Sequence, residues 1–210
     1  MTTDPSRELL LATSNSGKVR ELTQLLEGLP LRLRELSEFE PIQPVEETGV
    51  TFDENASLKA TSYGRLTGLL TLADDSGLEV EALGGAPGVR SARYAGVDAT
   101  DAQRVTRLLE ELKGVTDDGR GARFVCVLAL FDPSVAKLRS FRGVCAGRIA
   151  TSARGSRGFG YDPVFVPEGY DLSFAQLPTE IKQQISHRAR ALSEARDHLK
   201  LHFGNVASRH

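Results

Sequence analysis

A chain of 210 residues, 40% hydrophobic and 26% charged, is long enough for one soluble domain with a sizeable core. Its net charge of −2 excludes a general attraction to nucleic acid or to anionic membranes, so we expect neither as a partner. No apolar run approaches the roughly 20 residues of a transmembrane helix. Residues 1–8 (MTTDPSRE) lack the apolar stretch of a signal peptide.

The two cysteines, Cys126 and Cys145, lie in apolar segments typical of strands. We expect buried free thiols rather than a disulfide, which fits a reducing cytoplasm. Neither belongs to a Cys-x-x-Cys pair, so the sequence does not support a Cys₂His₂ zinc site. We therefore expect a cytoplasmic protein.

Helices and strands alternate along the first half of the chain. The stretch 8–13 (ELLLAT) predicts a short buried strand, and Asn15 or Ser16 can cap the following helix, which Gly28 is placed to end. Residues 31–36 alternate apolar with charged side chains, as in a strand with one solvated face. The next expected elements are a loop over 38–48, a helix over 52–66, strands over 69–73 and 77–83, and a turn over 84–88.

The second half continues in the same manner. Thr100 with Gln103 has the form of a capping box, which predicts a helix through Leu112. Ser186 can cap a last helix that carries apolar residues at helical spacing up to Phe203. Between these helices we expect a strand hairpin over 123–131 and 138–149, then a glycine-rich loop over 154–160. This alternation predicts an α/β fold with a mixed sheet.

The first of four polar clusters, 13–18 (TSNSGK), lies between a predicted strand and a predicted helix. Free N–H groups at a helix N-terminus attract phosphate, and Lys18 adds a full positive charge. The stretch is not a P-loop, because Ala12 and Val19 stand where that motif needs Gly and Ser or Thr. The alternative is a polar helix cap with an exposed lysine.

The second cluster joins 46–49 (EETG) to the start of the helix predicted at 52. Acidic residues ahead of a helix often serve only its macrodipole. Asn55 and Lys59 share one helix face at i, i+4, and both could point into a cleft.

The third cluster, 73–77 (ADDSG), places Asp74 beside Asp75 at the end of an apolar run. Adjacent carboxylates repel and raise each other's pKa unless a cation or hydrogen-bond donors intervene. One interpretation is a strand end with a polar turn. The other is a metal site, since Mg²⁺ takes carboxylate oxygens.

The fourth cluster combines 158–163 (GFGYDP) with 185–190 (ISHRAR). Phe159 and Tyr161 could stack on a base, and His187 with Arg188 could hydrogen-bond its edge; the alternatives are core aromatics and a solvated first helical turn. Cations are unfavourable at a helix N-terminus, so the His-Arg pair favours an anionic or carbonyl-bearing partner. The glycines at 155, 158 and 160 do not match the dinucleotide pattern G-x-G-x-x-G.

Taken in this order, the clusters resemble the inosine/xanthosine triphosphate pyrophosphatases, which remove deaminated purines from nucleotide pools. The matching stretches are LATSNSGKVREL, EETGVTFDENASLKA, LADDSGLEVEALGGAPGVRSARYAG, GFGYDPVF and ISHRARAL. Each motif alone is weak, but five long stretches in register are highly specific, and they run from Leu10 to about Leu192.

The resemblance implies an elongated α/β fold with two lobes around a mixed sheet, a nucleotide-binding cleft between the lobes, and a homodimer. We expect one domain over 1–210, in which residues 1–7 and about 204–210 lie outside the resemblance and are expected to be flexible tails. The implied reaction is hydrolysis of a purine nucleoside triphosphate (ITP, dITP or XTP) to the monophosphate and pyrophosphate.

Site residues carried over by position are also only implied by this resemblance. Glu46 and Asp75 would hold Mg²⁺, and Asp75 would also accept a proton. The phosphates would be held by Thr13, Ser14, Asn15, Ser16, Gly17 and Lys18. Further substrate contacts would come from Ser76, Phe159, Gly160, Tyr161, Asp162, Lys182, His187 and Arg188.

The implied chemistry agrees with the residue types. Attack at the α-phosphate needs charge neutralisation and a positioned water, which Mg²⁺, Lys18 and a carboxylate of the Asp74–Asp75 pair can supply. Which of the two carboxylates contacts the metal stays open. Arg188 has only donors, so it fits the O6 acceptor of hypoxanthine or xanthine and not the amino group of adenine.

Two other functions remain alternatives. One is a pyrophosphatase for other modified nucleotides. The other is a non-catalytic nucleotide sensor, against which the combination of Lys18, Glu46 and Asp75 argues, because a sensor does not need a metal and a base.

Overall fold

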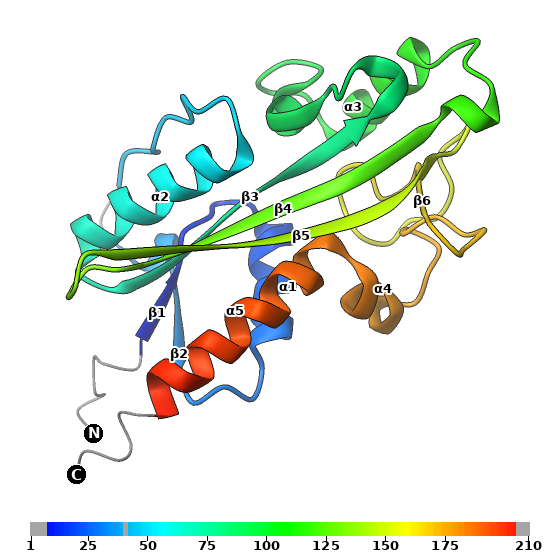
Figure 1. Cartoon of the computed structure of the whole chain (residues 1–210). Coiled ribbons are helices and arrows are strands. Elements are labelled where there is room, and N and C mark those ends of the chain that lie inside the picture. The colour runs from blue at the N-terminus through cyan, green and yellow to red at the C-terminus, as the bar shows by residue number, and fades with distance from the viewer. Residues whose placement is uncertain (1–7, 40–41, 205–210) are drawn as a thin grey trace. The chain divides into compact units, whose positions relative to one another are not determined.

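The computed structural model describes residues 8–39 and 42–204 (Figure 1). The tails expected at 1–7 and beyond Gly204 lie outside these residues, as do residues 40 and 41 of the expected loop. The chain divides into two compact units. The first contains residues 1–75, 127–142 and 190–210, and the second contains 76–126 and 143–189. A single domain over 1–210 and a cleft between lobes stay predictions.

One mixed six-stranded sheet has the order β2-β1-β3-β4-β5-β6. β1 runs parallel to both β2 and β3, whereas β5 and β6 are antiparallel. The strands are β1 (Glu8–Leu11), β2 (Arg32–Glu35), β3 (Leu70–Val80), β4 (Gly121–Asp132), β5 (Lys137–Ile149) and β6 (Phe165–Pro167). The helices are α1 (Ser16–Leu26), α2 (Phe52–Thr67), α3 (Asp101–Glu111), α4 (Thr179–Ile185) and α5 (His187–Gly204). The predicted α/β class with a mixed sheet is confirmed.

In the first unit, α2 covers one face of the sheet, and α1 and α5 cover the other (Figure 1). Small residues let α2 approach closely, because a Cβ on Gly64 would lie 2.6 Å from a ring carbon of Phe131 on β4. On the opposite face, Arg196 of α5 donates to the carbonyl oxygens of Leu25 and Glu27 at 2.6 and 2.8 Å. These bonds satisfy carbonyl groups that the end of α1 leaves without helical partners.

Three helices start at predicted caps. The Asn15 side chain accepts from the amide of Lys18, and Thr100 forms the predicted capping box with Gln103. Thr51 forms a further capping box with Glu54, which was not predicted from the sequence. α1 ends at Leu26, shortly before Gly28, which was expected to end it. The Ser186 hydroxyl accepts from the amide of Ala189 at 3.2 Å, which confirms the predicted start of α5.

The second unit has its own apolar core. α3 packs onto the sheet here, and the hairpin of β4 and β5 confirms the predicted pair of strands. Cys126 and Cys145 are buried free thiols, as expected. The core is formed by Leu78, Val80, Val105, Leu108, Leu112, Ala122, Phe124, Cys145, Ile149, Tyr161, Val164, Phe165, Phe174 and Leu177.

The turn interpretation at 73–77 is wrong. β3 runs without a break from Leu70 to Val80, so Asp74, Asp75, Ser76 and Gly77 all lie inside the strand. The two strands expected there are one, and residues 81–83 form a short 3-10 helix. Asp, Ser and Gly favour turns only where nothing else engages them, and here ion pairs and hydrogen bonds hold these polar side chains along an extended strand.

Candidate functional site

The loop from Thr13 to Asn15 joins the buried strand β1 to α1. The Thr13 hydroxyl accepts from the amide of Asn15 at 3.2 Å, and the Asn15 side chain accepts from the amide of Lys18 at 3.1 Å. Ser14, Asn15 and Ser16 are exposed, whereas Gly17 is buried. The N-terminus of α1 therefore presents its partial positive charge and its polar side chains to solvent, as an anion-binding helix start requires.

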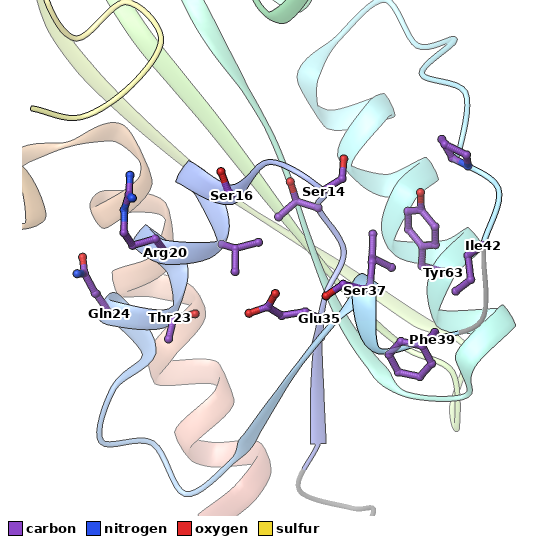
Figure 2. A pocket seen from close by; sticks show the side chains of 14 residues that line it. Ser14, Ser16, Arg20, Thr23, Gln24, Glu35, Ser37, Phe39, Ile42 and Tyr63 are labelled. Atoms are coloured by element: carbon purple, nitrogen blue, oxygen red, sulfur yellow. The ribbon is translucent and has the colours of Figure 1, made fainter.

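A pocket of about 830 Å³ opens beside this loop (Figure 2). Arg20, Thr23 and Gln24 of α1 lie on one side of it, and Phe39 and Tyr63 lie on the other. Thr13, Ser14 and Ser16 also line it, so the loop and the pocket share residues. Its volume is typical of small-molecule sites.

Asp74 is fully buried and forms an ion pair with Lys18, whose Nζ lies 2.5 Å from Oδ1. A lysine solvated at a helix cap is therefore the wrong interpretation of Lys18. The side chain bends toward β3 and is only 14% exposed. The pair holds the ammonium group of Lys18 close to the N-terminus of α1.

Asp75 points to a different cation. Its Oδ1 accepts from Nζ of Lys59 at 3.1 Å, and the same ammonium group donates to Glu47 at 2.6 Å and to the carbonyl oxygen of Asp74 at 2.9 Å. Because successive strand residues face opposite sides of a sheet, Asp74 meets α1 and Asp75 meets α2.

The electrostatics of this cluster follow from its burial. Burial raises the pKa of Asp75 above its ordinary value, although the charges of Lys59 and Lys18 act against the rise. Burial also acts to lower the pKa of Lys59, but the neighbouring charges of Asp75 and Glu47 outweigh it and hold that pKa above its usual value. Lys59 thus keeps its charge next to the carboxylates.

Two members of this cluster, Glu47 and Lys59, were not among the predicted site residues. Glu47 forms an ion pair with Lys59. Glu46, the metal ligand implied by the resemblance, is exposed, and its role stays a prediction. Lys59 was noted for its i, i+4 spacing with Asn55 but was not assigned a role. Asn55 is fully buried and binds the backbone of Gly49 through Oδ1 at 2.8 Å, so it holds the loop that carries the glutamates.

The donors present fit a magnesium ion completed by substrate. Oδ2 of Asp75 is buried and has no hydrogen-bond partner in the part of the chain that the structure describes. Among residues 8–39 and 42–204, no three His, Cys, Asp or Glu side chains gather closely enough to hold a metal ion by themselves. Mg²⁺ commonly binds one or two carboxylates and takes its other oxygens from phosphates and water.

A second group of predicted residues meets in the second unit. Arg188 is 1% exposed and donates to the hydroxyl of Ser76 at 2.9 Å. Its guanidinium carbon lies 5.8 Å from the ring centroid of Phe159, and Nζ of Lys182 lies 5.1 Å from the same centroid. Lys182 also forms an ion pair with Asp162 at 2.5 Å. A solvated first helical turn is thus the wrong interpretation of Arg188, which is buried beside an aromatic ring.

His187 and Tyr161 are buried as well. The His187 ring stacks on Phe124 with centroids 4.7 Å apart and planes 12° apart. Tyr161 belongs to the apolar core, and its hydroxyl donates to the carbonyl oxygen of Ser91 at 3.0 Å. Burial raises its pKa above the ordinary value. Tyr161 is therefore a core aromatic, as the alternative interpretation expected. Its contact with substrate stays a prediction.

The two groups suit different chemistry. In the first unit, a helix N-terminus, two lysines and buried carboxylates can bind an anion and hold a proton acceptor. In the second, donors of Arg188 and Lys182 surround the Phe159 ring, which suits a planar ligand with acceptor atoms on its edge. Within residues 8–39 and 42–204, none of the helices has the length and apolar character of a membrane span.

Comparisons with known proteins identify the family of the chain. The model of the Ham1 family matches residues 9–198. A dITP/XTP pyrophosphatase of Syntrophobacter fumaroxidans is 51% identical over 186 residues, which cover 89% of this chain and 79% of the relative. A dITP/XTP pyrophosphatase of Geobacter sulfurreducens is 48% identical over 191 residues, which cover 91% of this chain and 96% of the relative.

Solved structures agree in fold. A HAM1 protein from Coxiella burnetii superposes with a TM-score of 0.83 at 43% identity, covering 92% of this chain and 98% of that one. The Staphylococcus aureus Ham1 protein has a TM-score of 0.82 at 40% identity, with the same coverage. The family match, the curated relatives and the shared fold lead to one conclusion: the chain is a member of the Ham1 family.

Proposed function

We propose that the chain is a hydrolase that converts deaminated purine nucleoside triphosphates, namely ITP, dITP and XTP, to the monophosphate and pyrophosphate. The observation that carries this proposal is the buried Asp75, which pairs with Lys59 through one carboxylate oxygen and has no hydrogen-bond partner for the other among the described residues. The names of the curated relatives support the substrate class, since they are dITP/XTP pyrophosphatases.

The phosphates bind at the start of α1. Backbone amides of the loop 13–18 donate to phosphate oxygens, and Lys18 and Lys59 neutralise their charge. Asp75, with Glu46 from the loop before α2, would hold Mg²⁺. When bound, the ion neutralises triphosphate charge and lowers the pKa of a water molecule.

Asp75 accepts the proton in the chemical step. The water oxygen forms a bond to the α-phosphorus as the bond from that phosphorus to the oxygen bridging toward the β-phosphorus breaks. The proton of the water passes to Asp75, and pyrophosphate leaves with the bonding electron pair. Lys18 then stabilises the charge that develops on the leaving group.

The base binds in the second unit. Arg188 donates to O6 of hypoxanthine or xanthine, and Phe159 covers the ring face. Adenine has an amino group at this position, which offers Arg188 no acceptor where O6 would offer one. A site that is dry at this point can discriminate by roughly 10⁴-fold.

Pyrophosphate release tests the proposal. We expect release from ITP, dITP and XTP that far exceeds release from ATP and GTP, and loss of activity with EDTA that Mg²⁺ restores. Preference for a modified pyrimidine triphosphate would favour the first alternative, and nucleotide binding without turnover would favour a sensor.

We also propose a cytoplasmic homodimer. The two buried free thiols fit a reducing compartment, and the resemblance supports the dimer. Sedimentation at micromolar concentration tests the assembly, and a single species near 22.8 kDa would refute it.

A further inference from the structure

A long-range hydrogen bond ties the glycine-rich loop of the second unit to helix α3. The amide of Gly160 donates to Oδ2 of Asp101 at 2.7 Å, although the two residues are 59 positions apart in the chain. Asp101 is the first residue of α3 and belongs to none of the predicted site residues.

This bond is one of two that bracket Phe159. The amide of Phe159 itself donates to Oδ2 of Asp162 at 2.9 Å, and the next amide is the one held by Asp101. Gly158 and Gly160 have φ values of +77° and +61°, and the Phe159 carbonyl oxygen accepts from the amide of Asp162 at 3.2 Å. Beside that one backbone bond, two carboxylates hold the backbone on which the Phe159 ring is carried.

Asp101 is itself held in place. Its Oδ1 lies 3.2 Å from a guanidinium nitrogen of Arg104, so each of its two oxygens has its own partner. Arg104 is anchored by a bond to the carbonyl oxygen of Ala99 at 2.6 Å. The capping box of Thr100 fixes the backbone of the same turn. A rigid helix start thus carries the acceptor that the loop uses.

We propose that Asp101 is a positioning residue for base recognition. By holding the Gly160 amide, it keeps the Phe159 ring against Lys182 and Arg188, where the ring covers one face of the base. The proposal rests on the proposed function, because the base is the ligand that Phe159 would cover.

A purely structural role is the competing explanation. An acidic residue in the first turn of a helix is stabilised by the macrodipole and here also by Arg104. Both effects need the negative charge, whereas the bond to Gly160 needs only an acceptor oxygen. Asp101→Asn keeps the oxygen and loses the charge, and Asp101→Ala loses both. Asp53, an exposed acid in the first turn of α2, offers Asp53→Ala as a matched control for the dipole effect.

Two measurements separate these roles. Hydrogen exchange of the peptide over 158–161 should be faster in Asp101→Ala and unchanged in Asp101→Asn and Asp53→Ala. In steady-state kinetics, Asp101→Ala should raise KM for ITP about three- to tenfold, the equivalent of one hydrogen bond, with kcat within about twofold of wild type. The preference for ITP over ATP should fall by a similar factor, and Asp101→Asn should restore both values.

The remaining outcomes overturn the proposal. Equal effects of Asp101→Asn and Asp101→Ala would mean that Asp101 acts through its charge. Unchanged hydrogen exchange and KM in Asp101→Ala would mean that Asp101 does not position the loop. Failure of Asp101→Ala to fold would mean that Asp101 serves the stability of the fold. Inactivity of the wild-type protein on ITP would refute the proposed function instead, and the exchange measurement would still report whether Asp101 holds the loop.

Discussion

Nζ of Lys18 lies 2.5 Å from Oδ1 of Asp74, and the Asp74 side chain is fully buried. We expect Lys18→Met to weaken ITP binding more than inosine binding, because the ammonium group addresses phosphate. It should also destabilise the fold by about 3 kcal/mol, since it removes a cation from a buried carboxylate. Urea unfolding and ITP kinetics measure the two effects.

The double variant Lys18→Met/Asp74→Asn separates them. Removing both charges should recover most of the stability without recovering ITP hydrolysis. Recovery of activity, or equal losses for ITP and inosine in the single variant, would contradict the role of Lys18.

Asp75→Asn should lower kcat by about 10²–10⁴-fold if Asp75 is the proton acceptor. The amide keeps the shape of the side chain and loses its basicity, so the fold should be retained. Circular dichroism checks the fold and pyrophosphate release checks the rate. Asp74→Asn is the matched variant, and a folded Asp75→Asn protein with near-normal kcat would exclude the assigned role.

Arg188→Ala should reduce base selectivity. The correct base loses a charge-assisted bond of about 1.5–3 kcal/mol, while ATP loses little, so the ratio of their kcat/KM values should narrow about ten- to a hundredfold. The comparison uses ITP, XTP, GTP and ATP. Arg148→Ala, at a half-exposed arginine of the same unit, is the control. A uniform loss over all four nucleotides would instead indicate a role in phosphate binding or folding.

Tyr94→Phe should lower stability at neutral pH by about 1 kcal/mol, because the Tyr94 hydroxyl donates to the carboxylate of Glu111. Burial and this bond raise the pKa of Tyr94 to about 12, and the bonds from Tyr94 and Arg107 lower the pKa of Glu111.

The sign of each shift sets the pH window. The contribution of Tyr94 to the free energy of unfolding is complete below its ordinary pKa of 10.0 and disappears as pH rises toward its raised pKa of about 12. The contribution of Glu111 to stability is present above its ordinary pKa of 4.5 and disappears as pH falls through its lowered pKa in the folded protein. Urea unfolding of the wild type and of Tyr94→Phe at pH 7 and pH 3 should show that their difference in stability shrinks in acid. A constant difference would mean that the Tyr94–Glu111 hydrogen bond does not contribute to stability.

Caps and periodicity made most of the fold predictable. Asn15, Thr100 and Ser186 each start a helix by a local bond, which needs nothing beyond the neighbouring residues. β6 and the short α4 were missed, because three and seven residues carry too little periodic pattern.

The site was predictable in its residue types more than in its pairings. Lys18, Asp75 and Arg188 follow from motifs, but their partners Asp74, Lys59 and Ser76 depend on contacts that the chain makes only when folded. The turn expected at 73–77 failed for the same reason, since local propensity cannot register a cation brought from another helix.

Because β3 is unbroken, a change in the number of its residues would alter which side of the sheet each side chain faces. Because alternate residues face opposite sides, a one-residue deletion ahead of Asp74 would direct that carboxylate toward α2 and Asp75 toward α1. Each acid would then lose its lysine. The fold of the segment 70–76 is therefore less sensitive to the replacement of one side chain than to a change of length, and length variation in this chain belongs to its loops.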